Sequence, residues 1–91
     1  MKLRPVVVRD LPLNPIEWHF KKHKVVGRIL YRKVQGDYIY ELEHSSFKYK
    51  KISSLDDGES FLTLEEAGTA AEKWIDLWYS VQGRILSFGA F

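Results

Sequence analysis

The amino-acid sequence predicts an α+β fold, in which a three- to four-stranded antiparallel sheet packs on one amphipathic helix. Two segments, residues 25–34 and 38–43, are rich in β-branched and aromatic side chains, and Gln35-Gly36-Asp37 between them is typical of a tight turn. Residues 63–80 instead place apolar side chains at helical spacing. A chain of 91 residues is long enough for one core, so residues 1–91 are expected to form a single small domain.

The N-terminal segment carries two different signals. Residues 1–13 are expected to be an extended arm, with an edge strand over residues 5–9, because two prolines disfavour a helix around three consecutive valines. The following Asn14-Pro15-Ile16-Glu17 offers an N-cap, a proline at the first helical position and a carboxylate in the first turn. This pattern predicts a short N-terminal helix over about residues 15–22.

The predicted hairpin has one apolar face and one wetter face, because side chains alternate across a strand. Three side chains share the apolar face and three share the other, namely Tyr38, Tyr40 and Leu42 against Ile39, Glu41 and Glu43. A turn at Ser45-Ser46 and a third strand over residues 47–52 are expected to follow. Residues 53–60 are predicted to form a solvated loop.

The helix of residues 63–80 has a clear start. Thr63-Leu64-Glu65-Glu66 matches a capping box, in which the threonine hydroxyl accepts from the third helical amide. The apolar stripe behind it predicts the buried face, which consists of Leu64, Ala67, Ala71, Trp74 and Trp78. Gly83 is expected to end the helix, which leaves residues 84–91 as a C-terminal strand or tail.

The sequence carries no pattern typical of an enzyme. There is no cysteine, no nucleophile elbow, no phosphate-binding glycine loop and no dinucleotide fingerprint, so neither catalysis nor a cofactor is expected. His19 and His23 are spaced for one helix face but lack further ligands, so no metal site is expected. The short apolar runs predict no membrane segment, and the N-terminus lacks a secretory pattern, so a cytoplasmic protein is expected.

Charge is distributed unevenly along the chain. Residues 19–51 have a balance of +6 and residues 52–83 a balance of −6. Lysine and arginine neutralise phosphates and aromatic rings stack on bases, so the first segment predicts a nucleic-acid-binding surface on the sheet. The expected contacts are Lys21, Lys22, Lys24, Arg28, Arg32, Lys33, Lys48, Lys50, Lys51, Tyr31 and Tyr49. A solvated sheet face, whose lysines oppose edge-to-edge aggregation, is the alternative.

A protein partner is the second functional hypothesis, because tryptophan and other aromatic residues are common in interfaces. Trp74 and Trp78 belong to the buried stripe, whereas Trp18, Phe88 and Phe91 lie in short or terminal segments and are the expected contacts. The chain would then be an inhibitor or adaptor that acts through aromatic and acidic surfaces. The sequence leaves its oligomeric state open.

Two families have a similar layout. The stretch from Gly27 to Ile75 is similar to the AP2-like arm-binding domains of phage integrases, which read DNA with a three-stranded sheet braced by one helix; Glu41 and Glu43 depart from that pattern. The stretch from Tyr38 to Tyr79 resembles the N-terminal domain of HicB-type antitoxins, which bind a toxin. The first resemblance implies a small regulator of viral or mobile-element type, and the second implies a protein-binding inhibitor.

Overall fold

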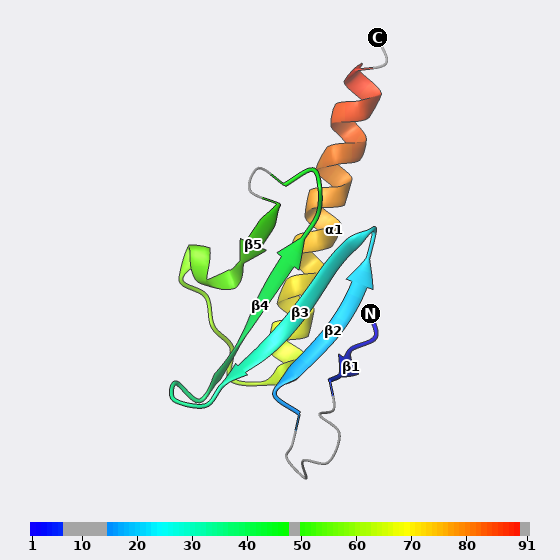
Figure 1. The fold of residues 1–91 in the computed structure, drawn as a ribbon. Coiled ribbons are helices and arrows are strands. Elements are labelled where there is room, and N and C mark those ends of the chain that lie inside the picture. The colour runs from blue at the N-terminus through cyan, green and yellow to red at the C-terminus, as the bar shows by residue number, and fades with distance from the viewer. Residues whose placement is uncertain (7–14, 48–49, 90–91) are drawn as a thin grey trace.

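Five antiparallel strands form one sheet, and a long helix crosses one of its faces (Figure 1). The computed structural model describes residues 1–6, 15–47 and 50–89, with side chains described as far as residue 82. The strands lie in the sheet in sequence order, so each one pairs with its neighbour along the chain. The expected α+β class is therefore confirmed, with five strands in place of three to four. The strands are β1 (Arg4–Pro5), β2 (Glu17–Lys22), β3 (Val25–Arg32), β4 (Asp37–Glu43) and β5 (Lys51–Ser53).

The prediction of a helix over residues 15–22 is wrong, because this segment contains β2. Trp18 and Phe20 alternate with more polar neighbours, and a two-residue turn lets all six residues of β2 pair with β3. The capping signal in the sequence is local and is worth about 1 kcal/mol. Pairing with β3 and burial of Phe20 outweigh it, since the ring is only 2% exposed.

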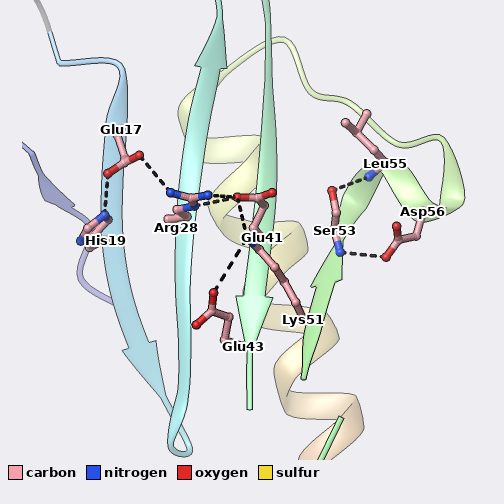
Figure 2. A network of polar contacts seen from close by, with 9 residues as sticks. All are labelled: Glu17, His19, Arg28, Glu41, Glu43, Lys51, Ser53, Leu55 and Asp56. Atoms are coloured by element: carbon pink, nitrogen blue, oxygen red, sulfur yellow. Dashed lines mark hydrogen bonds and ion pairs between the residues drawn. The ribbon is translucent and has the colours of Figure 1, made fainter. Parts of the chain in front are cut away.

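The described bounds of the two edge strands differ from those that the sequence predicts. β1 covers only Arg4–Pro5, and residues 7–14 of the expected arm lie outside the described residues. The third predicted strand, residues 47–52, corresponds to β5, which begins at Lys51 and pairs with the end of β4. Beyond β5 the chain forms the 3₁₀ helix η1 (Ser54–Asp57), where Ser53 caps the helix and exchanges hydrogen bonds with Leu55 and Asp56 (Figure 2).

The core lies between the sheet and the helix α1 (Leu64–Gly89). The predicted alternation on β4 is confirmed for four residues, because Tyr40 and Leu42 are buried in this core while Glu41 and Glu43 lie on the opposite, open face. It is wrong for Ile39, which was expected on the wetter face and is only 5% exposed. The helix contributes its predicted apolar stripe, with Trp74 and Trp78 partly buried against the core. The buried members of the core are Phe20, Val25, Ile29, Tyr40, Leu42, Phe47, Ala67, Ala71 and Ile75.

Helix α1 begins as predicted and ends later. The hydroxyl of Thr63 accepts a hydrogen bond from the Glu66 amide at 3.1 Å, which is the first half of the expected capping box. The expected stop at Gly83 and the strand or tail over residues 84–91 are wrong, because the helix continues to Gly89. Glycine inside a helix costs about 1 kcal/mol, which the good helix formers arginine and leucine after it partly offset. Residues 90–91 lie outside the described residues.

The C-terminal part of α1 extends past the sheet (Figure 1). The 26 residues of the helix span about 39 Å, and the long axis of the molecule measures 56 Å. Trp78 packs against Phe47 and His44, whereas Leu77 and Val81 on another side of the helix are exposed. Among the described residues, no helix combines the length and apolar character needed to cross a membrane.

Candidate nucleic-acid interface

The open face of the sheet, which points away from α1, is a network of ion pairs (Figure 2). Arg28 donates from Nε to Glu41 Oε1 at 2.6 Å, and its Nη1 lies 3.4 Å from Glu17 Oε1. Arg32 forms a two-pronged pair with Asp37, with both N–O distances at 2.7 Å. This pair holds the pKa of the Asp37 carboxyl below its usual value, because the guanidinium donates hydrogen bonds to the charged form.

These ion pairs reduce the positive potential that the sequence predicts for the sheet. The ammonium of Lys51 also lies near two carboxylates, at 4.0 Å from Glu41 and 3.9 Å from Glu43. An anionic strand laid across this face would meet a carboxylate beside each of three predicted cations, namely Arg28, Arg32 and Lys51. Glu41 and Glu43 on β4, noted as a departure from the integrase pattern, are the partners of Arg28 and Lys51.

Lys22 ties β2 to the helix instead of facing solvent. Its Nζ donates to Glu72 Oε2 at 2.9 Å and to Asp76 Oδ2 at 3.0 Å, and the N-terminal amino group lies 3.2 Å from Glu72. Hydrogen bonds from Lys22 lower the pKa values of both carboxyls, and the same bonds raise the pKa of Lys22. Lys22 is therefore part of the contact between the sheet and α1.

The Lys22 contact predicts a loss of stability in acid. A carboxyl whose pKa is lowered by folding stabilises the native state above its unfolded pKa, and this contribution disappears as the pH falls through the lowered value. Asp76→Asn is expected to lower the urea midpoint at pH 7 and to flatten its decline between pH 5 and pH 2. Glu65→Gln, on the same helix, is the control, because Glu65 has no ion pair among the described residues. An unchanged pH profile in Asp76→Asn would contradict this role.

Three exposed lysines gather at one end of the sheet, which we call the basic end: Lys21, Lys24 and Lys50. Lys21 lies near the end of β2, Lys24 lies in the β2–β3 turn, and Lys50 directly precedes β5. Because the strands are antiparallel, these positions lie at the same end of the sheet (Figure 1). None of the three forms an ion pair within the part of the chain that the structure describes. Glu43 lies at this end too, and its carboxylate is paired with Lys51.

The backbone at the basic end is strained. Within residues 1–6, 15–47 and 50–89, the residues other than glycine with positive φ are His23 at 50°, Lys24 at 66° and Lys50 at 63°. All three are histidine or lysine, and all lie at this end. The left-handed conformation costs a residue with a Cβ roughly 1–2 kcal/mol, and two-residue hairpin turns of this kind favour Asn-Gly. Basic residues thus occupy positions at which glycine would relieve the backbone strain. Retained backbone strain of this kind is typical of functional sites.

A histidine–tyrosine stack lies beside these lysines. The rings of His23 and Tyr79 are parallel within 5°, with centroids 3.9 Å apart, and His23 Nε2 is 3.4 Å from Asp76 Oδ1. Tyr79 remains 52% exposed. Sequence reasoning missed both rings, because the predicted helix over residues 15–22 gave no reason to place His23 in a turn against the flank of α1.

The other predicted contacts are scattered. Lys33 is exposed at the opposite end of the sheet, and Tyr31 packs against Tyr38 at a centroid distance of 5.0 Å. Trp18 lies against the core, with its ring 5.9 Å from Tyr38, so burial weakens its assignment to a partner surface. Phe88 belongs to α1 beyond the described side chains. Three further predicted contacts lie outside the described residues, namely Lys48, Tyr49 and Phe91.

Comparisons with known proteins assign no family. The chain matches no protein-family model, and no curated protein or solved structure matches it. Over the described residues, no cluster of three or more histidine, aspartate or glutamate side chains is arranged to hold a metal ion. The basic end, with its unpaired lysines and its aromatic stack, is therefore the candidate site on which a function can be argued.

Proposed function

We propose that this chain is a noncatalytic nucleic-acid-binding module that contacts phosphates through the basic end. The observation that carries this proposal is the coincidence, at one end of the sheet, of three lysines that have no acidic partner among the described residues and a turn that keeps basic residues at positive φ. The proposal keeps the expectation of a small cytoplasmic regulator of viral or mobile-element type. It moves the contact surface from the face of the sheet to its end.

The difference between solvated and paired cations supports a phosphate-binding surface at the basic end. A lysine that already contacts a carboxylate must give up that pair before it can neutralise a phosphate, whereas a solvated lysine only exchanges counterions. Lys24 and Lys50 are solvated, while Arg28 and Arg32 are paired. Phosphate contacts of this kind carry little sequence information, so the module is expected to bind many sequences with similar affinity.

Charge reversal at the two ends of the sheet tests the placement. Lys24→Glu and Lys33→Glu change the net charge equally, and both residues are exposed at ends of the hairpin strands. In fluorescence anisotropy with a labelled 20-nucleotide DNA strand at low salt, Lys24→Glu is expected to weaken binding about tenfold and Lys33→Glu less than twofold. Equal losses would show that affinity follows net charge alone, which would contradict a site at the basic end. Thermal midpoints establish that both variants fold.

A second candidate, a protein-binding adaptor, is favoured by the exposed apolar side chains on the extension of α1. Leu77 is 68% exposed and Val81 is 42% exposed, one turn apart on the same side of the helix. Exposed glutamates occupy the preceding turns of α1, so charge complementarity favours a partner protein with an apolar groove and a basic rim.

The salt dependence of binding distinguishes the nucleic-acid-binding module from the protein-binding adaptor. The uncharged variant Leu77→Gln/Val81→Thr tests the adaptor: a protein partner retained in extract at high salt by the wild-type chain, and lost with this variant, would support it. The same double variant is expected to bind DNA as the wild type does if the basic end is the functional site. Loss of DNA binding in that variant would contradict the first proposal.

A further inference from the structure

The stack of His23 on Tyr79 lies on the surface and not in the core. Neither ring belongs to the hydrophobic core or to the side chains packed against it. Tyr79 is half exposed although one face of its ring is covered by His23, so ring surface that the imidazole does not cover faces solvent. The side chain of His23 is 35% exposed. The pair is thus a flat, partly open aromatic surface.

Two neighbouring elements hold this surface in place. His23 occupies the strained β2–β3 turn, and its Nε2 lies 3.4 Å from Asp76 Oδ1 on the preceding turn of α1. Tyr79 stands on α1, just past the last tryptophan that packs on the sheet. The ring orientation is therefore fixed before any ligand arrives, which lowers the entropy lost on binding.

The charges around the stack are compatible with an anionic chain. Lys24 follows His23 directly and is exposed, whereas Lys21 lies on the open face of β2, because its neighbour Lys22 faces α1. Asp76, which lies 3.4 Å from His23, is also paired with Lys22, as is Glu72 one turn earlier on α1. A ligand that placed a ring on Tyr79 would therefore have the exposed Lys24 one residue from the stack, while Lys22 pairs with the Asp76 carboxylate beside it.

We infer that the ligand of the basic end is a single-stranded nucleic acid, one of whose unpaired bases stacks on the Tyr79–His23 pair. This inference rests on the proposed function and adds the class of nucleic acid to it. Every base offers a flat face, and stacking on aromatic side chains holds single strands with little sequence preference. In a duplex those faces are occupied by neighbouring base pairs, so a duplex can use the lysines but not the rings.

The test compares two single strands that differ only in their bases, with a duplex as a third probe. Fluorescein-labelled dT20, an abasic 20-mer with the same backbone charge and a 20-base-pair duplex are titrated with the wild-type protein at low salt. The wild type is expected to bind dT20 about fivefold or more tightly than the abasic strand, and more tightly than the duplex. Equal affinity for dT20 and the abasic strand would overturn the inference.

Two variants assign this preference to the ring. Tyr79→Leu removes the aromatic face and keeps an apolar side chain, and it is expected to lose the preference for dT20 over the abasic strand. Tyr79→Phe keeps the ring and is expected to retain that preference. The ratio of two affinities within one variant is insensitive to a partial loss of fold. A preference retained in Tyr79→Leu would place the base elsewhere and overturn the inference.

The Lys24→Glu variant separates the failure of this inference from the failure of the proposed function. It is expected to weaken binding of all three probes by a similar factor, because each probe carries phosphates. If Lys24→Glu has this effect while Tyr79→Leu behaves as the wild type, the basic end binds backbone alone and the base platform is refuted. If none of the probes binds the wild type, the proposed function fails together with the inference that rests on it.

Discussion

Phe20→Ala is expected to lower the free energy of unfolding by about 3–5 kcal/mol, the largest effect among the substitutions considered. Phe20 is 2% exposed in the middle of the core, although it comes from a segment whose local sequence favours a helix. A domain of this size has a total stability of roughly 5–14 kcal/mol, so the variant approaches complete unfolding. Urea denaturation followed by tryptophan fluorescence measures the loss. The exposed neighbour Lys21→Ala is the control, and a loss below 1 kcal/mol for Phe20→Ala would contradict the observed burial.

Gly27→Ala is expected to destabilise the chain by about 1–3 kcal/mol through overpacking. A Cβ at this position would overlap the Phe20 ring at Cζ and would lie 2.9 Å from Leu42 Cδ2, so these side chains or the backbone must move. Phe20 and Gly27 are partners across the β2–β3 ladder, and the absent side chain makes room for the phenyl ring. Val26→Ala, on the exposed face of the same strand, should change the stability by less than 1 kcal/mol. A neutral Gly27→Ala would show that the ring packs differently.

A double-mutant cycle ties these two effects together. If the phenyl ring occupies the space above Gly27, Phe20→Leu should relieve much of the clash, and Gly27→Ala should cost less in that background than in the wild type. Independent effects would instead simply add. Additivity within about 0.5 kcal/mol would contradict direct contact between the ring and the glycine.

The parts of the fold that were predicted correctly are those fixed by burial periodicity. The alternation from Tyr40 to Glu43 and the spacing from Leu64 to Trp78 reflect one buried face each, and both are read directly from the sequence. Ile39 departs from this alternation, because it is buried on the face that was expected to be wetter. The helix predicted over the β2 segment was wrong because a capping motif reflects only local sequence, whereas strand formation depends on pairing with β3. The prediction that the helix ends at Gly83 was wrong for a related reason. A glycine permits a helix to end but does not force it to end.

The site depends on information that a linear charge pattern lacks. Net charge over residues 19–51 identified a basic region, but the register decides that Arg28 faces Glu41 and that Arg32 faces Asp37. The separation of paired from unpaired cations therefore follows from tertiary structure. The positive φ of Lys24 is likewise a consequence of turn geometry, and its residue type favours other conformations.

The dependence of nucleic-acid affinity on salt tests the central claim most directly. Each phosphate contact with a single strand adds about −0.7 to the slope of log affinity against log salt concentration, so three lysines predict a slope near −2. The double variant Lys21→Glu/Lys24→Glu is expected to bind weakly and to have a slope shallower by about one or more. Measurable binding at low salt with these two slopes would support the basic end as the phosphate-binding surface. No binding by the wild type, or identical slopes in the two proteins, would contradict it.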